Sequence, residues 1–219
     1  MPIVVKGTAE ERAKVERWLQ QLCPHVRINA SNRVELVDSE GDMTEASCCC
    51  LKYLISGTAY VVTIYPLSGP GAVIPGTVGK KIGDHGGGAA DTDPGATYRY
   101  DPDELGRYIA GIGADTDVYF DISDNNGKGY FGYDAQNRPI SFPPFLLLGQ
   151  LLCTGYAYHN ARGTAARTRT VRSAQALAHE NAIRRGTPAP NGRPYAQRAN
   201  GFVCRVGMDG ITTRPPDNY

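Results

Sequence analysis

The residues that could do chemistry gather in the last third of the chain, in and after one apolar stretch. Residues 142–163 read FPPFLLLGQLLCTGYAYHNARG and hold no charged residue before Arg162. A thiol, a phenol and an imidazole lie in its second half, and further polar groups come from residues 173–185 and from the middle of the chain. The candidate catalytic residues are Cys153, His159 and Glu180, and the candidate binding residues are Tyr156, His179 and His85.

Cys153 offers a nucleophile, but a cysteine hydrolase needs a base in contact with the sulfur. His159 lies six residues further on, about 240° around a helix, so it cannot be that base. His179 or His85 would have to reach the sulfur through the tertiary fold. The alternative interpretation of Cys153 is an inert, buried side chain.

The same side chains could form a metal site only if they converged from distant positions, since imidazole and carboxylate groups ligate metals. No pair among them has the spacing of a zinc motif. The acidic run at residues 115–124 lacks the Gly and the Glu of a calcium loop. We therefore expect no metal and no cofactor.

The apolar stretch predicts the helix that must position these residues. Pro143 and Pro144 suit a helix start, where a missing N–H costs nothing, and Gly163 suits a helix stop. We expect a central helix at about residues 145–160. One face of it carries, at spacings of four, four and three residues, Leu148, Leu152, Tyr156 and His159. A buried core helix explains this pattern as well as a catalytic helix does.

The segment PPFLLLGQLLCTGYAYHNARG resembles the central helix of the NleD-like zinc-metallopeptidase effectors of bacterial secretion systems. In that family a Pro-Pro apolar lead-in runs into His-Glu-x-x-His, followed by Ala, an aromatic residue or Leu, His, and a tail ending in Gly. The strand VVTIYP, the Gly-rich loop after it, and the segment ENAIR followed by RPY are also similar. The resemblance implies a zincin-like metallopeptidase frame over residues 3–195.

Aligning the tail on residues 157–159 and Gly163 places the first zinc His of the family at Leu152, its general-base Glu at Cys153 and its second zinc His at Tyr156. Leucine cannot ligate a metal, and a phenol, whose pKa in water is about 10, is a poor ligand at neutral pH. A thiol cannot replace a carboxylate that moves protons to and from zinc-bound water. The zinc-peptidase mechanism is therefore not available to this chain.

The family takes its third zinc ligand from an acid after the zinc helix, and Glu180 is the matching candidate. If the frame is retained, Leu152 and Tyr156 should fill the space left by the metal. The polar side chains His159, Tyr156 and Glu180 should then be hydrogen-bonded to one another or to the backbone, because an unpaired buried polar group costs about 1–3 kcal/mol.

Three functions are compatible with these features. The first is an effector or toxin-type domain, a pseudoenzyme of a secretion system acting in virulence by binding a target or host protein. A cognate immunity protein or chaperone would be a second partner. The alternative is an enzyme with a rebuilt hydrolase site in the same cleft, and the third is a structural or regulatory module. Whether the chain is an enzyme stays open.

We expect an α+β fold in one domain, residues 1–219, with a small mixed sheet packed against the central helix. Helices are predicted at residues 9–22, 45–55 and 173–185, the first with a Thr8–Glu11 capping box. The clearest strand is residues 60–65, ended by Pro66. The family resemblance implies that it forms a hairpin with residues 98–101 beside the central helix. A long Gly-rich loop at 69–97 and an irregular tail at 199–219, with one strand at 202–206, complete the prediction.

Composition limits the partners and the compartment. The net charge of +1 gives no electrostatic case for nucleic acid or membrane. Residues 162–205 hold nine Arg against one acid, which indicates either a solvated basic face or a docking surface for an acidic partner or a phosphate-bearing substrate. Neither a membrane span nor a cleaved signal peptide is evident. We expect cytoplasmic residence, then export without a cleaved signal or delivery into a target cell. The six Cys should be mainly reduced, or joined by one disulfide between distant partners.

Overall fold

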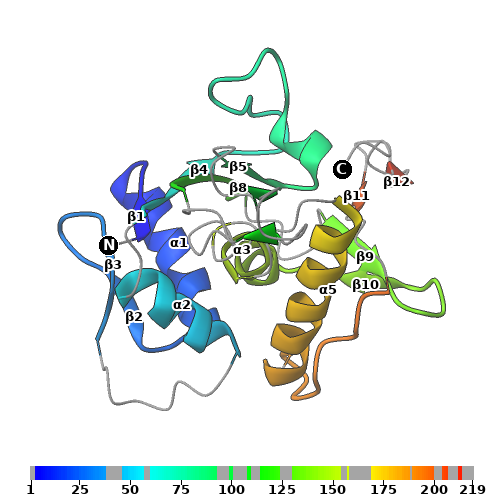
Figure 1. The fold of residues 1–219 in the computed structure, drawn as a ribbon. Helices are drawn as coiled ribbons and strands as arrows, with labels where there is room; N and C mark the ends of the chain where they lie inside the picture. The colour runs from blue at the N-terminus through cyan, green and yellow to red at the C-terminus, as the bar shows by residue number, and fades with distance from the viewer. Residues whose placement is uncertain are drawn as a thin grey trace.

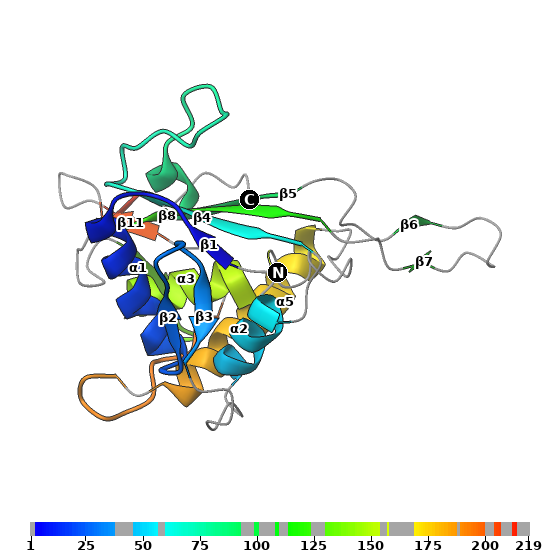
Figure 2. The ribbon, with the colours of Figure 1, turned by 90° about the vertical axis from the view of Figure 1, so that its left-hand side faces the viewer.

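The computed structural model describes residues 3–37, 46–56, 60–92, 99–100, 108–109, 114–123, 130–153, 157, 169–187, 189–199, 204–206 and 212–213. Within these ranges the fold is mixed α+β, as predicted. The helices lie on one face of a four-stranded main sheet, with the helix α3 in the middle (Figures 1 and 2).

The main sheet has the strand order β1-β4-β8-β5. Its first three strands, β1 (Ile3–Val5), β4 (Val62–Leu67) and β8 (Thr116–Asp121), are parallel, and β5 (Gly88–Thr92) runs antiparallel to β8. Buried β-branched and aromatic side chains such as Ile64, Val118 and Phe120 explain why these short runs form the centre of the sheet.

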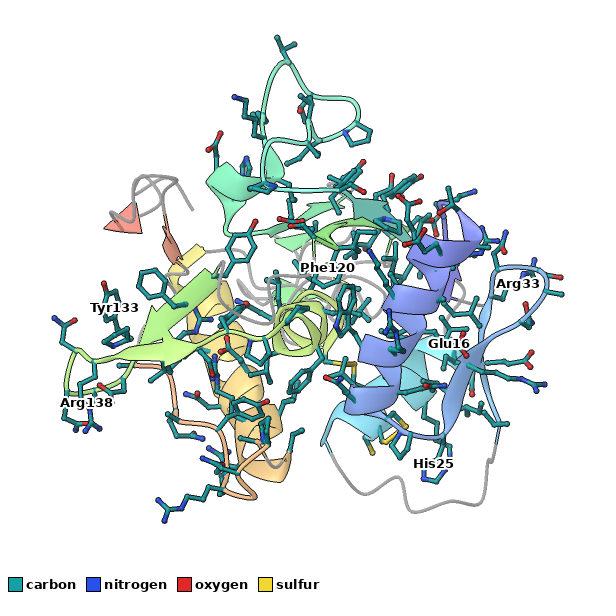
Figure 3. All side chains as sticks on the ribbon, turned by 180° about the vertical axis from the view of Figure 1, so that it is seen from behind. Glu16, His25, Arg33, Phe120, Tyr133 and Arg138 are labelled. Atoms are coloured by element: carbon teal, nitrogen blue, oxygen red, sulfur yellow. A yellow bond between two sulfur atoms is a disulfide. The ribbon has the colours of Figure 1, made fainter. Side chains whose placement is uncertain are left out.

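The first helix, α1 (Ala9–Leu22), begins at the predicted capping box: the Thr8 hydroxyl accepts from the Glu11 N–H, and the Glu11 carboxylate accepts from the Thr8 N–H. Val15, Leu19 and Leu22 form its buried stripe. Trp18 meets Phe120 of β8 edge to face at 5.3 Å between ring centroids, which packs the helix against the sheet. Phe120 is labelled in Figure 3.

The predicted helices at residues 45–55 and 173–185 are formed, the second with a start at Arg169, and further strands accompany them. The hairpin β2 (Val26–Ile28) and β3 (Val34–Leu36), the helix α2 (Ala46–Ser56) and the helix α5 (Arg169–Gly186) are formed. A second sheet has the order β10 (Pro139–Ser141), β9 (Tyr130–Tyr133), β11 (Cys204–Val206) and β12 (Thr212–Thr213). The tail after residue 199 therefore contributes two strands, not one.

The predicted central helix is α3 (Pro144–Cys153), which begins at the Pro pair. Ala157 is also helical, and residues 154–156 and 158–160 lie outside the described ranges. Eight of its ten residues are buried. A Cβ on Gly149 would lie 2.9 Å from Leu22 Cδ2 of α1 and 3.0 Å from Ile183 Cδ1 of α5. Gly149 therefore lets both neighbouring helices approach α3 closely.

The predicted loop at 69–97 contains regular structure, which corrects that expectation. Residues Ile82–His85 form the 3₁₀ helix η1, and β5 supplies the edge of the main sheet. Gly88 of β5 is typical of a loop in sequence, but in the structure it allows close packing. A Cβ on Gly88 would lie 2.7 Å from Leu151 Cδ1 and 3.1 Å from Leu147 Cδ1, both in α3.

Pro66 does not end β4, which continues to Leu67. The Ile64 carbonyl accepts from the Lys6 N–H on the β1 side, and alternation places the Pro66 nitrogen on the same side. Because Pro66 has no N–H to donate on that side, the pairing with β1 ends at Val5, while β4 continues beside β8 to Leu67.

The prediction of a hairpin between residues 60–65 and 98–101 is also wrong. Both neighbours of β4 in the main sheet, β1 and β8, are parallel to it. The strand β6 (Arg99–Tyr100) pairs with β7 (Tyr108–Ile109) instead. The strands that pack against the central helix are β5 and β8.

The contact between β5 and α3 predicts that Gly88→Ala lowers the free energy of unfolding by about 1–3 kcal/mol, because the new methyl group must displace Leu147 and Leu151 in a close-packed core. Gly71→Ala is the matched control, since a Cβ there meets nothing within 4 Å. Urea denaturation followed by fluorescence measures both variants. Equal stability of the two variants would contradict the close approach of β5 to α3.

Candidate functional site

The α3 positions that carry the first zinc His and the general base in the resembling family lie in the core of this protein. Leu152 is 0% exposed and Cys153 is 1% exposed. Both belong to the main hydrophobic cluster, together with residues of α1, α2 and the main sheet.

The sulfur of Cys153 is joined to Cys50 of α2, and a second disulfide joins Cys48 of α2 to Cys23 at the end of α1. Sulfur atoms, yellow in Figure 3, lie beside these helices. The prediction that the cysteines are mainly reduced, with one disulfide at most, is therefore wrong. The Cys153 sulfur is not a thiolate in this structure and is not available as a nucleophile.

The two disulfides differ in the length of chain that they close. The sequence separations are 25 residues for Cys23–Cys48 and 103 residues for Cys50–Cys153. By the chain-entropy argument, cross-links of this kind stabilise a fold by roughly 3–5 kcal/mol, the longer loop giving the larger gain. They add to the packing that holds α2 against its neighbours.

Glu180 lies at the centre of a buried ion cluster between α5 and the chain that follows it. Its Oε1 accepts from Arg184 Nε at 2.7 Å and from Arg198 Nε at 3.1 Å, and its Oε2 accepts from Arg198 Nη2. All three residues are at most 2% exposed. These partners differ from the predicted ones, Tyr156, His159 or the backbone, and they give Glu180 a structural position rather than that of a metal ligand.

The ring of Phe142 completes the cluster. The guanidinium carbons of Arg184 and Arg198 lie 5.2 Å and 5.1 Å from its centroid, within range of a cation–π interaction. Arg184 Nη1 also donates to the carbonyls of Ser141 and Ala196. Burial lowers the pKa of Arg184, the Glu180 carboxylate opposes this effect, and Arg198 adds to it. The cluster ties α5 to the start of α3 and to residues 196–198.

Of the remaining predicted site residues, the structure describes the side chain of His85 alone. His85 ends η1 beside β5 and β8, where burial lowers its pKa; Lys80 adds to this effect and Asp84 opposes it. His179 belongs to α5, and its side chain lies outside what the structure describes. Tyr156 and His159 are also outside the described ranges. Among the described residues, no three His, Cys, Asp or Glu side chains form a group that could hold a metal.

A carboxylate at the end of β8 was not predicted. Asp121 is 3% exposed, and its Oδ1 accepts from the N–H groups of Gly69 and Ser123 while its Oδ2 accepts from the Tyr130 hydroxyl at 2.6 Å. Gly87 allows this approach of Tyr130, since a Cβ there would lie 2.6 Å from Tyr130 Cζ. The only sequence signal is an Asp that ends a strand directly after the three residues Val118, Tyr119 and Phe120, all of which are buried. The carboxyl ends of parallel strands often bind ligands, but here Asp121 holds three chain segments together.

Two further observations concern partners. Arg184 and Arg198 are buried, so the basic segment presents less charge to solvent than its sequence indicates. No helix in the described residues has the length and apolarity to span a membrane.

Comparison of the chain with protein-family models, with curated proteins and with solved structures finds no match.

The ion cluster predicts that Glu180→Gln lowers the free energy of unfolding by about 3–5 kcal/mol, because it leaves two buried guanidinium groups without their counter-charge. Glu35→Gln is the control: Glu35 pairs with Arg27 at 2.6 Å near the surface, where solvent screens the pair and the loss is small. Thermal unfolding by circular dichroism compares the two variants. A Glu180→Gln protein as stable as wild type would show that Glu180 is not structural.

Proposed function

We propose that this chain is an effector or toxin-type domain that acts by binding a target protein, on a zincin-like frame that has lost its zinc-peptidase chemistry. The observation that carries the proposal is the state of α3. Where the resembling family has a zinc His and its general base, this chain has a buried Leu152 and a Cys153 that is bonded to Cys50. Hydrolysis has neither a metal ligand nor a proton carrier at these two positions.

The arrangement around α3 supports the resemblance on which the proposal rests. A strand from the Gly-rich segment packs against the central helix, although it is not part of the hairpin that the resemblance implied. In this chain the strand is β5, held against Leu147 and Leu151 through Gly88. The ENAIR segment supports it as well, because its Glu180 and Arg184 form the buried pair that fixes α5. These positions would then be retained for the frame and not for catalysis.

The two disulfides favour an oxidising compartment for this protein over a reducing cytosol. Disulfides form and persist in oxidising compartments and are rare in cytosolic proteins. A chain that is exported through an oxidising compartment passes through such surroundings, whereas a resident cytosolic protein does not. This favours the delivered effector over a cytosolic regulatory module.

Binding to another protein also has a suitable surface. The segment at residues 69–81 projects from the main sheet (Figures 1 and 2). It is held in shape by backbone hydrogen bonds, including Ile74 N–H to the Lys80 carbonyl and Ile82 N–H to the Ala72 carbonyl. Its tip carries Val78, whose side chain is fully exposed, next to the exposed Lys80. A preorganised apolar tip with neighbouring positive charge suits an acidic, partly apolar partner.

The proposal predicts that the purified, oxidised protein binds no stoichiometric zinc and hydrolyses neither casein nor p-nitrophenyl esters, with or without added zinc. Elemental analysis after dialysis and product release over time measure both properties. The Cys50→Ala/Cys153→Ala double variant is the control for a rebuilt cysteine hydrolase. Turnover that disappears in this variant would support the hydrolase alternative, and chelator-sensitive cleavage with bound zinc would contradict the loss of metal chemistry.

A further inference from the structure

Both disulfides of the described residues end on α2, two residues apart. Cys48 is joined to Cys23 at the C-cap of α1, and Cys50 is joined to Cys153 of α3. Helix α2 packs against α3 and α5, and its Leu51 and Leu54 are buried in the main cluster. The covalent link between α2 and α3 is therefore the single Cys50–Cys153 bond.

The two disulfides are not equally shielded from a reductant. Cys50 is 5% exposed, whereas the exposed fractions of Cys23, Cys48 and Cys153 are 0%, 1% and 1%. The next residue, Cys49, is an exposed free thiol, so one face of α2 reaches solvent. Of the four bonded cysteines, all of which are buried, Cys50 has the largest exposed fraction, and we expect thiolate attack to begin at its sulfur.

We propose that the Cys50–Cys153 disulfide is a reducible latch between α2 and α3, and that its reactant is a dithiol reductant of the compartment that the protein enters. One thiolate of the reductant attacks the Cys50 sulfur, forms a mixed disulfide and releases Cys153, which takes up a proton. The second thiol of the reductant then attacks the mixed disulfide. The reductant leaves oxidised, and Cys50 and Cys153 are left as thiols.

The Cys23–Cys48 bond confines the effect of reducing Cys50–Cys153 to the contact between α2 and α3. After reduction of the latch, α2 stays attached to α1 through Cys48 but is held against α3 by packing alone. Segments held by fewer constraints open more often than the rest of a fold. Opening of α2 would uncover a side of α3 that is buried in the oxidised protein. This proposal rests on the proposed function in one respect: the protein must move from an oxidising compartment, where the disulfide forms, to a reducing one, where it is cleaved.

Hydrogen–deuterium exchange of the wild-type protein, with and without dithiothreitol, tests the latch. We expect exchange in peptides covering α2 and α3 to become about tenfold faster or more with dithiothreitol, while exchange in β4 and β8 stays unchanged. The Cys50→Ala/Cys153→Ala variant should show the fast exchange without dithiothreitol and respond no further at α3. The Cys23→Ala/Cys48→Ala variant is the matched control and should still respond to dithiothreitol at α3.

Two outcomes would overturn the latch. In the first, α3 exchanges at one rate in oxidised wild type, reduced wild type and the Cys50→Ala/Cys153→Ala variant. In the second, exchange rises equally in β4 and β8, which means that reduction unfolds the whole domain. The wild-type comparison decides the question even if a variant fails to fold. Failure of the latch is separate from failure of the proposed function, because zinc content and hydrolysis are measured on the oxidised protein.

Discussion

The structure depends on the burial of one uncharged helix. Helix α3 is covered by the main sheet on one side and contacts α1, α2 and α5, and its side chains form the centre of the largest hydrophobic cluster. Close approach on two sides requires Gly149 in α3 and Gly88 in β5, because a side chain at either position would meet its neighbours within 3.0 Å. The Cys50–Cys153 disulfide and the Glu180 ion cluster then fix α2 and α5 around this helix.

This burial also bears on the proposed loss of zinc chemistry. A zinc helix must present two imidazoles and a carboxylate to a space that admits water and substrate. In the alignment that we propose, the fully buried Leu152 and the disulfide-bonded Cys153 stand at two of those positions, so the helix contributes to the core and to a covalent cross-link there. Two other carboxylates are buried. Glu180 accepts hydrogen bonds from two guanidinium groups, and Asp121 accepts them from backbone N–H groups and the Tyr130 hydroxyl. Both carboxylates hold chain segments together.

Features set by local sequence could be predicted, and features set by long-range contacts could not. The Thr8–Glu11 capping box, the Pro pair before α3 and the β-branched run of β4 each specify their own element within a few residues. The Gly-rich run of β5 gives no strand signal, since its value lies in a contact with a helix some sixty residues away. Disulfide pairing, the partners of Glu180 and the hydrogen bond between Asp121 and Tyr130 likewise depend on which segments the fold brings together.

The central claim is that the Cys153 sulfur is committed to Cys50 and is not a working nucleophile. Mass spectrometry of the native protein, alkylated with iodoacetamide and digested without reductant, tests it directly. We expect three linked peptides, one containing Cys23, one containing residues 48–50 and one containing Cys153, with the exposed Cys49 alkylated as an internal control. Carbamidomethylated Cys153 in the folded, unreduced protein, on a peptide that is not linked to any other, would contradict this pairing.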